Sequence, residues 1–114
     1  MSGMAISGLH LTQIGRESFL LEPSRSLDIS GSDDLLVEIL QRLQEAKAST
    51  LYYDLAELPL IEPRYYRWLN MLARACRAVN VEMVCIRMQP TAAFALSSYM
   101  QGAPDFAVGQ GVTQ

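Results

Sequence analysis

Hydrophobic and polar residues follow regular spacings along most of the chain. In residues 6–14 and 18–22, apolar residues alternate roughly with polar ones, as on strands that bury one face. The short stretch 15–17 separates the two segments, and they therefore predict a β-hairpin. Residues 50–55 and 81–88 are short, apolar and β-prone, which indicates two buried strands.

Two longer segments carry apolar residues every three or four positions, the spacing of an amphipathic helix. The first covers residues 33–47, and Ser32 is its expected N-cap. The second covers residues 64–79, with Pro63 in its first turn and Asn80 as its expected stop. The stripes expected to face the core are Leu36, Ile39, Leu40, Leu43 and Ala46 in the first helix and Tyr65, Leu69, Leu72, Cys76 and Val79 in the second.

The last quarter of the chain predicts one more helix and a short strand. The helix opens at Gln89-Pro90-Thr91 and runs to about Gln101, where Gly102 ends it. Residues 106–108 form an optional final strand. The element order is then β-β-α-β-α-β-α with that last strand, which requires a mostly parallel sheet with helices packed on it. The hairpin makes the predicted α/β sheet a mixed one.

The composition is that of one globular domain over residues 1–114, with a core at about 9–108. Half of the 114 residues are hydrophobic and 18% are charged, which excludes a disordered chain. A net charge of −3 argues against nucleic-acid binding. No apolar run approaches the roughly 18 to 20 residues of a membrane helix, and residues 1–4 lack the features of a signal peptide. We therefore expect a cytoplasmic protein.

Few side chains suggest catalysis or metal binding. His10 is the only histidine, and Cys76 and Cys85 lie in a helix and a strand without a C-x-x-C motif. No glycine-rich phosphate loop is present. Glu57 and Glu62 flank an apolar loop, where they form either an acid pair or, as we favour, part of the loop and of a helix start. We expect no enzyme, catalytic residue, metal or cofactor.

The second predicted helix carries an arginine stripe on the side opposite its apolar residues: Arg64, Arg67, Arg74 and Arg77. Two interpretations remain open. The stripe is either a solvated face or a contact surface for an acidic partner, which would relieve the repulsion between the arginines. The outer face of the first helix is itself acidic, with Asp34, Glu38 and Glu45. Self-association or binding to a related subunit is therefore a physically reasonable expectation.

Two segments resemble a known family. Residues 51–62 (LYYDLAELPLIE) and 84–96 (VCIRMQPTAAFAL), together with the element order, look like the STAS domain (sulphate transporter and anti-sigma-factor antagonist). The second segment and Ser26-Leu27-Asp28 are most similar to bacterial stressosome scaffold and co-antagonist proteins. The resemblance covers about residues 9–108. It implies a non-enzymatic signalling protein that acts as a stressosome scaffold or as a kinase-sequestering antagonist.

The resemblance also implies a phosphorylation switch, from which this chain departs. In the family, a partner kinase modifies a serine or threonine directly after an acid at the start of the second helix, and the added charge releases the partner. The matching positions here are Glu62 and Pro63, and proline has no hydroxyl. A second family phosphosite falls on Ala95, with Ser97 and Ser98 close by as alternative sites.

The implied partners are sister STAS sensor proteins and a serine/threonine kinase, or an anti-sigma factor, within a homo- or hetero-oligomer. The residues expected to bind them are Glu57, Glu62, Pro63, Arg64 and Arg67. Two alternatives remain: a free anti-sigma-factor antagonist that works by partner switching, and a ligand-binding STAS sensor. The size of the oligomer separates the scaffold from the free antagonist.

Overall fold

The computed structural model describes residues 3–6 and 8–112. Its strands are β1 (Gly3–Ile6), β2 (Leu9–Gln13), β3 (Ser18–Pro23), β4 (Thr50–Asp54), β5 (Glu82–Ile86) and β6 (Ala107–Gly109), and its helices are α1 (Ser32–Glu45), α2 (Pro63–Ala78) and α3 (Pro90–Ser97). Residues 1–2, 7 and 113–114, which belong to the predicted domain and its first strand, lie outside the described residues.

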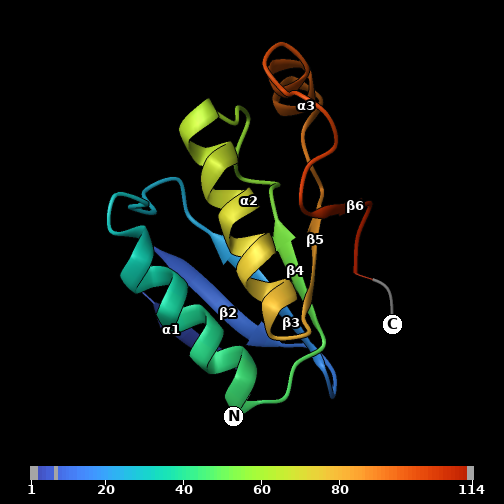
Figure 1. Ribbon diagram of the computed structural model, residues 1–114. Helices are drawn as coiled ribbons and strands as arrows, with labels where there is room; N and C mark the ends of the chain where they lie inside the picture. Colours follow the sequence, from blue (N-terminus) through green and yellow to red (C-terminus); the bar gives the residue numbers. More distant parts are fainter. Residues whose placement is uncertain (1–2, 7, 113–114) are drawn as a thin grey trace.

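The strands form a single sheet in which each strand lies beside its neighbours in the sequence, in the order β1-β2-β3-β4-β5-β6. β1, β2 and β3 pair antiparallel, whereas β3, β4, β5 and β6 run parallel. α1 and α2 lie side by side across one face of the sheet, and α3 stands beyond one end of it (Figure 1). The predicted α/β class, the N-terminal hairpin and the mostly parallel sheet are confirmed.

The first predicted strand, residues 6–14, is wrong in its extent, because the chain turns at Gly8 and makes two strands there. Gly8 has a φ of 87°, a left-handed conformation that favours glycine. A Cβ atom at this position would lie only 2.9 Å from the Cα atom of Leu27. The turn lets β1 pair with β2, from Gly3 opposite Thr12 to Ile6 opposite Leu9.

The core lies between the sheet and the two long helices. Its most buried members include Leu21, Leu51 and Tyr53 from the sheet, Ile39 and Leu43 from α1, and Leu69, Leu72 and Cys76 from α2. Leu35 is the third buried residue of α1, whereas the predicted stripe residues Leu36, Leu40 and Ala46 are only partly buried. The predicted Ser32 N-cap is also wrong. Gly31 occupies that position without a side-chain hydrogen bond, and α1 begins one residue early.

Helix α2 matches its prediction closely, since Pro63 is its first residue and Asn80 follows its end with a φ of 63°. Helix α3 is shorter than predicted and ends at Ser97, well before Gly102. The hydroxyls of Ser97 and Ser98 donate hydrogen bonds of 2.7 Å to carbonyl oxygens three residues earlier. Such bonds compete with the helical pattern. The optional last strand is confirmed, displaced by one residue.

The structure bears on two further features of the chain. No helix in the part of the chain that the structure describes has the length and apolarity needed to cross a membrane.

The outer face of α1 is acidic as predicted, because Asp34, Glu38 and Glu45 are all exposed.

Candidate functional site

The loop between β4 and α2, residues 55–62, forms the centre of the site at one end of the sheet. Its backbone begins as a continuation of the sheet, since the amide of Leu55 donates to the carbonyl of Ile86 at 2.9 Å. The amide of Leu58 then donates to the carbonyl of Leu55 at 3.0 Å and closes a turn. Leu58 and Ile61 are buried, but the side chain of Leu60 is 61% exposed. Leu58 and Ile61 therefore fix the loop to the hydrophobic core, while Leu60 is exposed to solvent.

Side chains from the segment that follows β5 hold the loop from one side. The Nε2 atom of Gln89 donates to the carbonyl oxygen of Ala56 at 2.6 Å. The hydroxyl of Thr91 donates to the carbonyl of Pro59, and the hydroxyl of Tyr99 to that of Ile61. Each bond satisfies a loop carbonyl that no strand or helix would pair, so the loop and α3 are joined as one structural unit.

On its other side the loop is held by the connection between β3 and α1. The Nε atom of Arg25 donates to the carbonyl oxygen of Glu57 at 3.2 Å. The Glu57 side chain itself is exposed. Asp28 in the same connection accepts bonds from the hydroxyl and the amide of Ser30. These bonds lower the pKa of its carboxyl group, so that the exposed aspartate stays ionised beside the loop.

An ion pair closes the base of the loop. The carboxylate of Asp54, at the end of β4, is only 5% exposed and accepts two bonds from the guanidinium of Arg87 and one of 2.9 Å from the amide of Ala56. Arg87 follows β5 directly and has a φ of 56°, which is unusual for a residue with a side chain. The hydrogen bond and the charge of Asp54 raise the pKa of Arg87. A buried carboxylate without such a partner would be strongly unfavourable.

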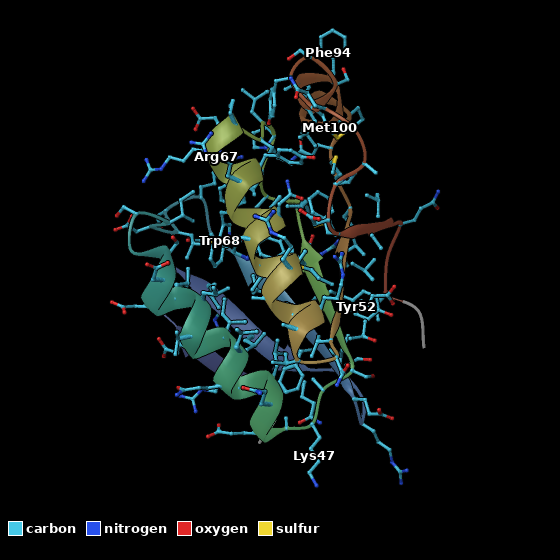
Figure 2. All side chains as sticks on the ribbon, viewed as in Figure 1. Lys47, Tyr52, Arg67, Trp68, Phe94 and Met100 are labelled. Atoms are coloured by element: carbon cyan, nitrogen blue, oxygen red, sulfur yellow. The ribbon has the colours of Figure 1, made fainter. Side chains whose placement is uncertain are left out.

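The start of α2 lies next to the loop and is exposed. Glu62 is the N-cap with extended backbone angles, and Pro63 takes the first helical position. This position tolerates proline because its backbone N–H would have no hydrogen-bond partner within the helix. The first turn contains no acidic residue and no side-chain cap. Arg64 and Arg67 project one turn apart, and Figure 2 shows Arg67 pointing away from the helix. Among the described residues, Arg67 has no ion pair or hydrogen-bond partner for its side chain.

Two hollows flank these residues. The smaller, about 270 Å³, is lined by Arg25, Asp28, Leu58, Leu60, Glu62, Arg64 and Tyr65 among others. The larger, about 600 Å³, runs along α2 and includes Arg64, Arg67, Trp68 and Arg74 in its lining. Arg64 therefore borders both. Glu62, Pro63, Arg64 and Arg67 lie together at the start of α2, and Glu57 lies in the adjoining loop. Neither Pro63 nor Glu57 lines either hollow.

The arginine stripe of α2 is only half available. All four of its arginines are exposed, but Arg74 lies 3.6 Å from the carboxylate of Asp105, and Arg77 donates to the Asp105 carbonyl at 2.6 Å. The amide of Asp105 is held in turn by the side chain of Asn70 at 2.8 Å. The chain therefore supplies its own partner for the second half of the stripe. Only Arg64 and Arg67 remain for another molecule.

A buried hydrogen-bonded cluster supports α2 from beneath. The hydroxyls of Tyr53 and Tyr65 lie 2.5 Å apart, and the indole nitrogen of Trp68 donates to Tyr53 at 3.1 Å. Burial raises the pKa of Tyr65 to about 12 and raises that of Tyr53 well above its usual value. Both hydroxyls therefore stay protonated at physiological pH, and the cluster locks the first two turns of α2 onto β4.

The other candidate groups lie apart from this surface. Ser97 and Ser98 are exposed on α3 with their hydroxyls bonded to the helix backbone, and His10 is exposed on β2. Cys76 and Cys85 are free and buried, and burial raises the pKa of Cys76 to about 12 and that of Cys85 further. Within the described ranges no three histidine, cysteine or acidic residues gather as metal ligands would.

Sequence reasoning missed the residues that hold the loop. The sequence predicts Gln89 and Thr91 as part of a helix start and Asp54 as part of a strand, but nothing in their spacing indicates contacts across 32 or 33 residues. Tyr99 carried no signal beyond its place in an expected helix. No sequence pattern indicates Asp105 as a partner for the arginines, because it follows the end of α2 by almost thirty residues.

Comparisons with known proteins identify the fold. No family model and no curated protein matches the chain. Among solved structures, a Ser-to-Glu variant of RsbS from Moorella thermoacetica matches with a TM-score of 0.71 at 15% identity, over 90% of this chain and 86% of that one. The solution structure of the protein TM1081 matches with a TM-score of 0.65 at 9% identity, over 83% of this chain and 74% of the other. The chain therefore shares the fold of RsbS, which is the STAS fold that its motifs resemble.

Proposed function

We propose that this protein is a non-enzymatic STAS signalling domain, over residues 1–114, that acts in the cytoplasm as a stressosome scaffold or kinase-sequestering antagonist. Its partners are sister STAS sensor proteins and a serine/threonine kinase, which bind at Glu57, Glu62, Pro63, Arg64 and Arg67. Neither a nucleic acid nor a membrane takes part. The likeness to RsbS in fold and the motifs at residues 51–62 and 84–96 support this role.

The observation that carries the proposal is the construction of the loop and the helix start. Three hydrogen bonds from Gln89, Thr91 and Tyr99 hold the loop 55–62, and Pro63 sets the backbone at the first position of α2. A surface that is held in one shape before binding loses less conformational entropy when a partner docks. A loop that is held in this way suits a binding surface.

Pro63 gives the binding surface a constant state. A phosphate at the helix start would add a charge of about −1.5 to −2, but proline cannot accept one. The surface therefore keeps the form that binds the partner, and switching belongs to other subunits of the assembly. The two available arginines favour an acidic segment on the partner, because such a contact relieves their mutual repulsion.

Phosphorylation tests the constant state directly. Ser97→Ala/Ser98→Ala removes the two alternative phosphosites on the chain. With the cognate kinase, this protein is expected to take up no phosphate in residues 55–70, because that segment contains tyrosines but no serine or threonine. Adding Pro63→Ser restores a hydroxyl after Glu62 and is expected to create one phosphosite, located by mass spectrometry of peptides. Transfer to this segment without Pro63→Ser, or none with it, contradicts the proposal.

Charge reversal tests the binding surface. Arg67→Glu is expected to abolish capture of the kinase and the longer STAS sensors from native cells, as quantified by mass spectrometry against the tagged wild type. Removing one charge partner at an interface typically changes affinity by at least tenfold. Arg16→Glu is the matched control, since Arg16 is exposed in the β2–β3 turn, at the end of the sheet opposite to the loop 55–62. Equal loss in both variants, or no loss in Arg67→Glu, contradicts the assignment.

Particle size decides between the proposal and its nearest alternative. A large particle recovered with the captured sensors supports the scaffold, whereas a monomer or small dimer that captures only an anti-sigma factor supports a free antagonist working by partner switching. A ligand-binding sensor would instead show a thermal shift with a nucleotide or lipid.

A further inference from the structure

Helix α3 carries an unusual apolar surface at the far end of the molecule. The side chain of Phe94 is 81% exposed, and Figure 2 shows it pointing away from every other element, beyond the top of the helix. A phenyl ring exposed to this degree has no role in the core. The segment 89–104 contains no charged residue, although the chain as a whole has a net charge of −3.

The same helix borders an apolar groove on its inner side. The groove measures about 210 Å³ and is lined mainly by Met88, Ala93, Leu96, Met100, Phe106 and Val108. Leu96 and Phe106 are buried at its floor, whereas Val108 and Met100 are exposed at its rim. Ser97 supplies the one side-chain hydroxyl of the lining. α3 stands beyond the end of the sheet (Figure 1), and the groove lies between residues of α3 and residues of the segment 104–108.

The protruding ring and the groove have matching size and chemistry. An apolar cavity of about 150 Å³ accommodates a benzene ring, so a groove of about 210 Å³ has room for the side chain of Phe94. Within one molecule the two cannot meet, because Phe94 follows the groove residue Ala93 by one position and is therefore turned about 100° from it around the helix. A second copy of the chain can bring them together.

We propose that α3 is a self-association surface at which Phe94 of each copy enters the groove of the other. Two α3 helices that run parallel about a twofold axis place each ring opposite the partner's groove, so the contact is made twice and closes on itself. The uncharged segment 89–104 favours a second copy, since two acidic molecules approach there without placing like charges in contact. The contact lies outside the surface formed by Arg64 and Arg67.

The dimer is expected to be concentration-dependent, because a contact built on two short helices lies at the low end of interface sizes. Removing both buried rings with Phe94→Ser is expected to raise the dimer dissociation constant by about 100-fold. Analytical ultracentrifugation over a series of concentrations measures this change. Val37→Ser is the matched control: Val37 is also an exposed hydrophobic residue, 53% exposed, but lies on α1, and its loss is expected to leave the dimer intact.

A complementation experiment separates this contact from general apolar association. Ala93→Arg fills the groove with a charged side chain but keeps Phe94, whereas Phe94→Ser keeps the groove. Each variant alone is expected to be monomeric, while a mixture forms a heterodimer through the one intact ring and the one intact groove. A monomeric wild type, a dimer that survives Phe94→Ser, or a mixture that stays monomeric overturns the proposal. Arg67→Glu is expected to leave this dimer unchanged. A failure of the α3 dimer proposal is therefore distinguishable from a failure of the proposed partner binding at Arg67.

Discussion

Raising the pH from 9 to 12 is expected to unfold the protein, because its two buried thiols resist ionisation only in the folded state. A cysteine in the unfolded chain ionises near pH 9, whereas burial raises the pKa of Cys76 to about 12 and that of Cys85 further. Below pH 9 both states hold these protons, and the stabilisation is complete. Above pH 9 the unfolded state releases them first, and the free energy of unfolding falls as the pH rises toward the folded pKa.

The expected fall in the free energy of unfolding between pH 9 and 12 is larger than the effect of any single substitution considered above. Each thiol is expected to cost about 1.4 kcal/mol per pH unit, so that Cys76 alone removes about 4 kcal/mol between pH 9 and 12. Tyr53 and Tyr65 add to the slope above pH 10, since burial raises their pKa values as well. Domains of this size are typically stable by only about 5–15 kcal/mol.

Urea denaturation at a series of pH values measures the slope. Cys76→Ala is expected to lower the stability at pH 7 slightly, but to reduce the slope between pH 10 and 12 by about 1.4 kcal/mol per unit. Thiolate absorbance of the folded protein is an independent readout. If thiolate forms near pH 9 without unfolding, the burial argument is wrong.

Replacing Arg87 with alanine is expected to lower the free energy of unfolding by about 2–3 kcal/mol. The substitution leaves the carboxylate of Asp54, which is 5% exposed, without its charged partner. This expected loss of stability is smaller than that for a fully buried ion pair, because the Arg87 side chain is 55% exposed. Chemical denaturation measures the loss, and the loop 55–62 is expected to show faster amide exchange in the same variant.

Substituting the other member of the ion pair tests whether the loss of stability comes from the unpaired carboxylate. Asp54→Asn is expected to cost less, since it leaves the half-exposed guanidinium in contact with water and keeps an acceptor for the amide of Ala56. The double variant Asp54→Asn/Arg87→Ala is then expected to be more stable than Arg87→Ala alone. Arg87→Gly is the backbone control, because glycine adopts the positive φ of this position without strain. Equal losses in all three single variants would show that the ion pair does not determine the stability.

The elements that sequence reasoning predicted well are those whose signals are local. The spacing of Leu69, Leu72 and Cys76 places one face of α2 in the core, and Pro63 marks the first position of that helix because its ring suits no other. The absence of a hydroxyl at position 63 is also visible in the sequence. In α1, Ile39 and Leu43 are buried as predicted, but Leu35 is buried in place of Leu36, since both follow the apolar spacing and only packing selects between them.

The residue pattern alone therefore predicts the order of strands and helices from β2 onward, the STAS-like motifs and the missing hydroxyl at Pro63, but not the separate strand β1. The pairing of distant side chains emerges only in the folded chain: Arg87 with Asp54, Thr91 with the loop, and Asp105 with half of the arginine stripe. The periodic burial of a helix or strand depends on residues close together in the sequence. Contacts across about thirty residues depend instead on strand register and on where each crossover helix returns the chain to the sheet.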